Sequence, residues 1–98
     1  MTEQEQTTDK AIKVAEQILA AILKKIPKHE GFVRRYETAD TGFIEIALRP
    51  ENATSRVNEI TTAYSDEYFL SANKENISDK ARRILNDFKV LLGVKSAV

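Results

Sequence analysis

The sequence predicts an α+β fold: a two-layer sandwich in which a four-stranded antiparallel sheet, made of two hairpins, carries the N- and C-terminal helices on one face. Three observations predict it. Apolar residues recur at helical spacing near both ends of the chain, strand-forming residues fill the middle, and turn residues separate the segments. The predicted order is therefore α-β-β-β-β-α, and helices on one face of such a sheet form two layers.

The length of 98 residues fits one domain. We expect residues 1–7, which are polar and acidic, to form a flexible tail, residues 8–94 to form the domain, and residues 95–98 to form a flexible end.

The first helix is predicted to begin at Thr8 and Asp9, which supply a capping hydroxyl and an acid in the first turn. It should end near Lys25 or Ile26, because Pro27 disfavours helical geometry at the residue before it. The block ILAAIL, residues 18–23, is apolar on every side of a helix. We therefore expect it to contact at least two neighbours among the sheet, the second helix and a dimer partner.

Two hairpins are predicted in the middle of the chain. The first joins residues 31–38 to residues 42–50, where apolar residues at 44, 46 and 48 alternate with a mostly polar set, Glu45, Ala47 and Arg49. The second joins VNEITTAY, residues 57–64, to EYFLSAN, residues 67–73, because threonine, tyrosine and phenylalanine favour strands. Val57, Ile60 and Tyr64 also fit a helical spacing, so residues 54–64 have two interpretations.

The last helix is predicted to begin at Ser78 and Asp79 and to end at Gly93 in a left-handed cap. Its apolar face consists of Ala81, Ile84, Leu85, Phe88, Leu91 and Leu92.

Composition and charge exclude several classes of site. The chain has no cysteine, which excludes disulfides and thiolate metal sites. The start of the chain lacks the basic and apolar regions of a signal peptide, so we expect a cytoplasmic protein. The longest apolar run has six residues, too few to span a membrane. His29 is the single histidine, and no companion ligand or nucleophile accompanies it, so we expect no enzyme activity, metal or cofactor.

The charges balance overall, with 15 basic and 15 acidic residues, but they are segregated. Residues 10–35 hold seven bases and two acids, residues 36–79 hold three bases and nine acids, and residues 80–98 hold five bases and one acid. This pattern predicts basic helices and an acidic sheet.

The sequence favours a small non-enzymatic regulatory protein, such as an inhibitor, an adaptor or an immunity-type protein, that acts through protein–protein contacts. Its candidate contact residues in the acidic middle third are Phe43, Glu45, Glu59, Glu67 and Phe69. Apolar helix residues beyond one core face also predict self-association as a homodimer. The candidates for that contact are Ile18, Ala21 and Val90.

The alternative is a nucleic-acid-binding module that uses the basic helices. Its candidate contacts are Lys24, Lys25, Lys28, Arg82 and Arg83. Strand alternation sends Arg34 and Arg35 to opposite faces, and zero net charge gives no long-range attraction to phosphate. One contiguous basic face would favour this alternative, whereas a basic helix layer opposite an acidic sheet, or scattered charges, would favour protein binding.

Overall fold

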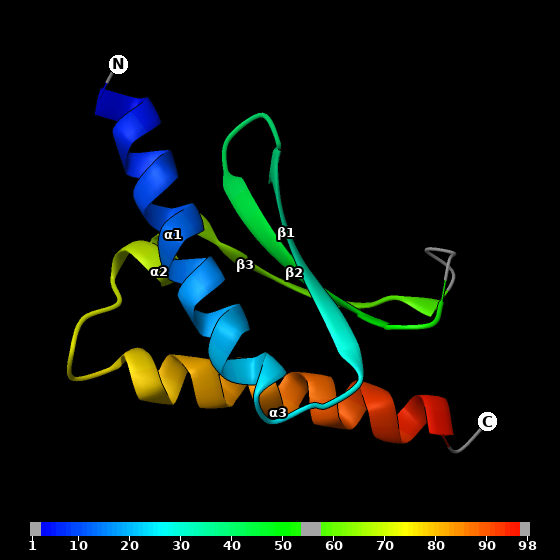
Figure 1. Ribbon diagram of the computed structural model, residues 1–98. Helices are drawn as coiled ribbons and strands as arrows, with labels where there is room; N and C mark the ends of the chain where they lie inside the picture. The colour runs from blue at the N-terminus through cyan, green and yellow to red at the C-terminus, as the bar shows by residue number, and fades with distance from the viewer. Residues whose placement is uncertain (1–2, 54–57, 97–98) are drawn as a thin grey trace.

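A computed structural model describes residues 3–53 and 58–96 (Figure 1). The α+β class is confirmed, with helices at both ends of an antiparallel sheet, but the sheet has three strands in the order β1-β2-β3. The elements are α1 (Glu3–Leu23), β1 (His29–Glu37), β2 (Gly42–Pro50), β3 (Ile60–Ser65), α2 (Asp66–Leu70) and α3 (Ile77–Ser96).

The two long helices cover one face of the sheet. Helix α1 packs against β1 and β2, and α3 packs against β3. The C-terminal end of α1 crosses α3, and the two helices are in contact (Figure 1). The predicted alternation of β2 is confirmed, since Ile44, Ile46 and Leu48 are fully buried beneath these helices. The opposite face of the sheet therefore points outward.

The position of α1 explains the ILAAIL block. Ile18, Leu19 and Ile22 are buried, whereas Ala20 and Ala21 are exposed. Helix α1 contacts the sheet, α2 and α3, so its apolar residues are needed on more than one side within a single chain. No dimer partner is required to cover Ile18.

The predicted fourth strand is wrong, because residues 66–70 form helix α2. Ser65 occupies the N-cap position, and Asp66 and Glu67 lie in the first turn, where acids interact favourably with the helix dipole. The short helix turns the chain back over the core and buries Phe69 completely. Burial of this ring therefore outweighs the strand preference of the aromatic residues.

Other boundaries also differ from those predicted. Residues 60–64 of the ambiguous segment lie in β3, whereas residues 54–57 fall outside the described part of the chain. Helix α1 begins at Glu3, ahead of Thr8, because the intervening glutamates and glutamines are good helix formers. Helix α3 continues through Gly93, which has no left-handed backbone, to Ser96. A glycine within a helix costs only about 1 kcal/mol, so flanking residues can carry the helix past it.

Two glycines offer a matched test of this packing. A Cβ on Gly31 would lie 2.9 Å from Cγ and Cδ2 of Leu19 and closer still to Cδ1, so alanine there would displace the Leu19 side chain that packs against β1. A Cβ on Gly93 would meet nothing within 4 Å. We expect Gly31→Ala to lower the free energy of unfolding by about 1–3 kcal/mol. Gly93→Ala should raise it by about 0.5–1 kcal/mol, because alanine loses less entropy in a helix. Urea denaturation measures both, and equal effects of the two variants would contradict the close α1–β1 contact.

Candidate functional site

The outward face of the sheet is the candidate site. The register pairs Arg34 with Glu45 and Tyr36 with Phe43 across β1 and β2. Since alternate side chains of a strand share a face, these residues point away from the buried Ile44 and Ile46. We call this surface the open face. It is formed by Glu30, Phe32, Arg34, Tyr36, Phe43, Glu45, Arg49, Glu59, Thr61 and Ala63.

Arg34 is the centre of an ion-pair network on the open face. Its Nη1 donates to Oε1 of Glu45 at 2.9 Å, and its Nη2 donates to Oε1 of Glu59 at 2.8 Å. A second bond, 3.0 Å from Nη1 to Oε2, makes the contact with Glu59 bidentate. The Glu59 side chain is only 4% exposed. These hydrogen bonds, first those to Glu59, raise the pKa of Arg34 still further above its usual range. The network ties β1 to β2 and to the residue that precedes β3.

Aromatic rings lie among these charges. The guanidinium of Arg49 lies 4.7 Å from the centroid of the Phe32 ring, and that of Arg34 lies 5.7 Å from it. Cations over an aromatic face are attracted by the ring electrons. Tyr36 is 46% exposed, and its hydroxyl donates to Oε1 of Glu45 at 3.3 Å. The open face therefore combines half-exposed aromatic rings with arginines held in place by several contacts.

The structure brings together part of the predicted protein-contact set. Phe43, Glu45 and Glu59 share the open face, and Glu67 is exposed on α2. Phe69 is a correction: it is fully buried in the core, because α2 replaces the fourth strand. Four further residues of the open face were not among the predicted contact residues, namely Phe32, Arg34, Tyr36 and Arg49. The alternation of β1, combined with the β1–β2 register, is the signal that identifies all four.

The open face is less acidic than the sequence predicts, because it carries both signs of charge. Arg34 comes from the basic part of the chain, whereas Glu45 and Glu59 come from the acidic part. On the helix-covered face, Arg35 pairs in the same way with Glu37 and Asp66, each at 2.7 Å. Strand pairing therefore cancels much of the segregation seen along the sequence.

A polar cleft of about 740 Å³ lies at the β1–β2 turn. Arg35 lines it, but both of the carboxylates paired with this arginine line it as well. Four threonines complete much of the wall, namely Thr7, Thr8, Thr38 and Thr41. The lining also includes Asp40 but no histidine. His29 lies elsewhere, with its Nδ1 2.9 Å from the carbonyl oxygen of Pro27.

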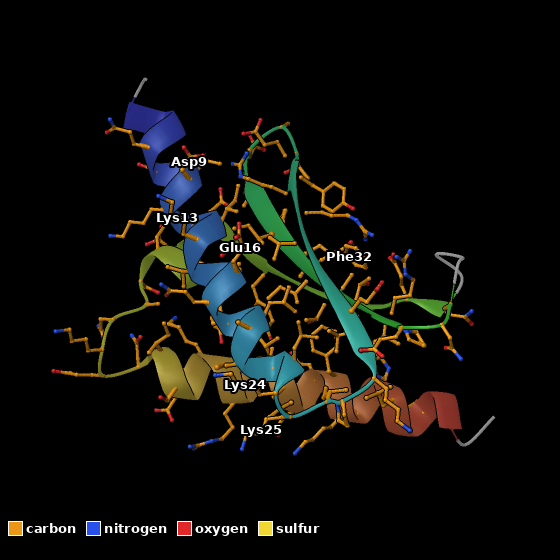
Figure 2. All side chains as sticks on the ribbon, in the orientation of Figure 1. Asp9, Lys13, Glu16, Lys24, Lys25 and Phe32 are labelled. Atoms are coloured by element: carbon orange, nitrogen blue, oxygen red, sulfur yellow. The ribbon has the colours of Figure 1, made fainter. Side chains whose placement is uncertain are left out.

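The basic candidates do not form one continuous surface. Lys24, Lys25 and Lys28 are exposed around the end of α1. Figure 2 shows Lys24 and Lys25 near the crossing with α3, well away from Phe32. Arg82 borders the same cleft as Lys25, about 230 Å³ in volume, between the two helices. Its neighbour Arg83 instead lies near the hydroxyl of Tyr64, around the helix from Arg82.

The self-association candidates separate in a similar way. Ile18 is a correction, because it is 1% exposed and belongs to the core of the single chain. Ala21 is exposed and lines the cleft that Lys25 and Arg82 border. Val90 is 66% exposed on α3. The three residues therefore do not form one surface.

Tyr64 joins β3 to α3 in a further cluster. Its hydroxyl donates to Oδ2 of Asp87, and its ring stacks on Tyr68 with the centroids 4.3 Å apart. Lys80 places its Nζ 4.0 Å from the centroid of the Tyr68 ring. Burial, and then the carboxylate of Asp87, raise the pKa of Tyr64 to about 12. Burial likewise raises the pKa of Tyr68.

This shift predicts a pH dependence of stability. An unfolded tyrosine has a pKa of 10.0, so between pH 10 and about 12 the folded state holds the Tyr64 proton more tightly. The stabilisation is complete below pH 10 and is lost as the pH rises through that interval. We expect the free energy of unfolding of the wild type to fall more steeply there than that of Tyr64→Phe. Urea denaturation across the interval measures both slopes, and parallel slopes would contradict the assignment.

Two observations bear on the class of site. Among residues 3–53 and 58–96, no three histidine or acidic side chains form a group that could hold a metal ion. In the same part of the chain, no helix combines the length and apolar character required to cross a membrane.

Comparison of the chain with models of protein families, with curated proteins and with solved structures gives no match.

Proposed function

We propose that this protein is a small non-enzymatic binding protein that regulates another protein through contacts made by its open face. The observation that carries the proposal is the composition of that face: Tyr36, Phe32 and Phe43 lie beside Arg34 and Arg49 on a sheet covered by helices on its other side. Tyrosine and arginine are enriched among the residues that dominate the binding energy of protein interfaces. An inhibitor, an adaptor or an immunity-type protein would use such a surface.

The rigidity of the open face supports this proposal. Arg34 is held by two carboxylates, and the Tyr36 hydroxyl is held by Glu45. Side chains that are already ordered lose less conformational entropy when a partner binds. A partner would therefore meet a preorganised surface, with Tyr36 as the most exposed aromatic anchor.

The charges on the open face favour a protein over a nucleic acid. Exposed aromatic rings on a sheet can stack on bases, but binding a strand also requires cations for its phosphates. The open face has two arginines, Arg34 and Arg49, against three glutamates, Glu30, Glu45 and Glu59. Its formal charge is therefore negative, and both arginines are already paired with glutamates.

The basic helices are the second candidate, as a nucleic-acid-binding surface. The observation in its favour is that Lys25 and Arg82 border one cleft, with Lys24 nearby. Against it, Arg83 lies apart and Arg82 is paired with Asp79 at 3.5 Å. A working phosphate site would show a steep loss of affinity with salt, about 0.9 in log affinity per log salt for each phosphate neutralised in duplex DNA.

Tyr36→Ala tests the proposed contact surface. Wild-type protein is used to capture partners from an extract of the native host, and each captured protein is then purified and titrated by calorimetry. We expect Tyr36→Ala to weaken binding by about 30-fold or more, the effect of losing a residue worth about 2 kcal/mol in an interface. The circular dichroism spectrum should be unchanged, because the Tyr36 side chain is exposed.

Lys24→Ala is the matched control on the helix layer, where the side chain is also exposed. It should bind the partner like the wild type. Two results together would reject the open face and support the basic helices. Tyr36→Ala would bind the captured partner with full affinity, and the wild type would bind a random DNA duplex tightly, with a steep dependence on salt, in a way that Lys24→Ala weakens.

A further inference from the structure

We propose that two copies of this protein pair through the free edge of β3, with the α3 helices of the two copies packed side by side. The pairing would be antiparallel about a two-fold axis and would join the two sheets into one. The contact uses the edge of β3 and one side of α3, and it borders the open face at Thr61.

The free edge of β3 lacks the usual protection of an edge strand. In the order β1-β2-β3, the two edges of the sheet are β1 and β3. Edge strands present unpaired backbone groups, and proteins usually protect them with charged residues, proline or bulges. Strand β1 carries Arg34, Arg35 and Glu37, whereas β3, with the sequence ITTAYS, carries no charge and no proline. Strand β3 is therefore the edge that is open to pairing.

A groove follows this edge of the sheet. A cleft of about 350 Å³ is lined by Thr61 and Thr62 on one side and by Asp87, Val90 and Leu91 of α3 on the other. Consecutive strand residues point to opposite faces. A cleft that touches both threonines therefore follows the edge of β3 rather than either face of the sheet, and α3 forms its wall.

An apolar stripe on α3 lies beside the groove. Val90 and Val94 are 66% and 61% exposed, and they lie one helical turn apart on the same side. Val90 lines the groove, so the stripe continues along its border. With Tyr36, these two valines are the large hydrophobic side chains that lie exposed in the described part of the chain.

The neutral sequence of β3 suits a second copy as the occupant. In a two-fold contact the same edge of both copies is brought together, so a strand that carries a net charge would repel its copy. A neutral strand such as β3 avoids this repulsion when it pairs with itself. Asp87, the acid that lines the groove, already accepts a hydrogen bond from Tyr64. One symmetric contact therefore covers both the backbone edge and the valine stripe.

This dimer would place two open faces on one continuous sheet. If the proposed function is correct, the dimer would offer two contact surfaces, and a partner with two matching sites would bind with increased avidity. Only this consequence depends on the proposed function. The pairing itself is tested without any partner.

Size exclusion with light scattering, over a range of micromolar concentrations, tests the pairing directly. We expect the wild type to reach twice its monomer mass of 11.1 kDa. Val90→Glu introduces the same buried charge from both copies, so it should raise the dissociation constant by about tenfold or more. Ala21→Glu is the matched control, because Ala21 is also exposed but lies in the α1–α3 cleft. It should dimerise like the wild type.

Hydrogen exchange of the wild type at low and high concentration identifies the contact without relying on a variant. The backbone amides of β3 that point away from β2 should become protected from exchange as the dimer forms. The backbone amides at the free edge of β1 should not. A wild type that stays monomeric would overturn the proposal, as would loss of the dimer in Ala21→Glu but not in Val90→Glu. A dimer without added protection in β3 would also overturn it. Circular dichroism establishes that each variant is folded.

Discussion

Phe69→Ala is expected to lower the free energy of unfolding by about 3–5 kcal/mol, the range for removing a buried phenylalanine. The ring is fully buried and is among the largest side chains in the core. It makes edge-on contacts with Tyr68 and Tyr64, whose ring centroids lie 5.3 Å and 6.5 Å away. Alanine would leave a cavity beneath α2 and remove both aromatic contacts. Urea denaturation followed by circular dichroism measures the loss.

Two further variants serve as controls for Phe69→Ala. Phe69→Leu keeps most of the volume, so it should cost less than Phe69→Ala, about 1.5 kcal/mol or below. Lys24→Ala removes an exposed side chain on α1 and should change the free energy of unfolding by no more than about 0.5 kcal/mol. If Phe69→Ala were as mild as Lys24→Ala, α2 would not close the core, and the predicted strand would again have to be considered.

Arg34→Met should have the second largest effect, a loss of about 1.5–3 kcal/mol in the free energy of unfolding, the range for hydrogen bonds to charged groups. Methionine keeps much of the aliphatic stem but removes the guanidinium that contacts Glu45 and Glu59. Glu59 would then keep a nearly buried carboxylate without its bidentate partner, and a buried charge that loses its counterion is costly. Thermal and urea denaturation at neutral pH measure the effect.

Arg82→Met is the control, because it removes an arginine that lies outside the Arg34 network. Its ion pair with Asp79 spans 3.5 Å, and both side chains are largely exposed. Solvent screens such pairs, so the change should stay within about 0.5 kcal/mol. Similar effects of the two substitutions would show that the Arg34 network contributes no more than a surface pair, and the rigidity attributed to the open face would be lost.

Local patterns in the sequence determined the elements whose burial is one-sided. Strand β2 alternates because Ile44, Ile46 and Leu48 lie beneath the helices while Glu45 and Arg49 point outward. The helical spacing in the terminal segments likewise identified α1 and α3. In each of these elements the apolar residues are spaced so that they fall on the side that faces the core. The local sequence pattern and the tertiary packing therefore favour the same structure.

The segment after β3 shows where local reasoning fails. Tyr68 and Phe69 favour a strand by propensity, yet a strand would place these neighbours on opposite faces of the sheet. As helix α2, the segment buries Phe69 and also lets the Tyr68 hydroxyl donate to the carbonyl oxygen of Lys80 at 3.0 Å. The position of the core relative to this segment is set by other parts of the chain, so the residues of the segment alone do not predict the helix.

The candidate site depended still more on tertiary structure. Segregation of charge along the sequence predicted an acidic sheet, and it selected Phe43, Glu45 and Glu59 as candidate contact residues. Only the register of β1 against β2, and the approach of Glu59, brought Arg34 into that surface and reduced its negative charge. Ion pairs form between residues far apart in the chain, so their partners are set by strand pairing rather than by local composition. The periodicity of a segment therefore decided which side of it is buried, whereas the identity of the surface was decided by which segments lie side by side.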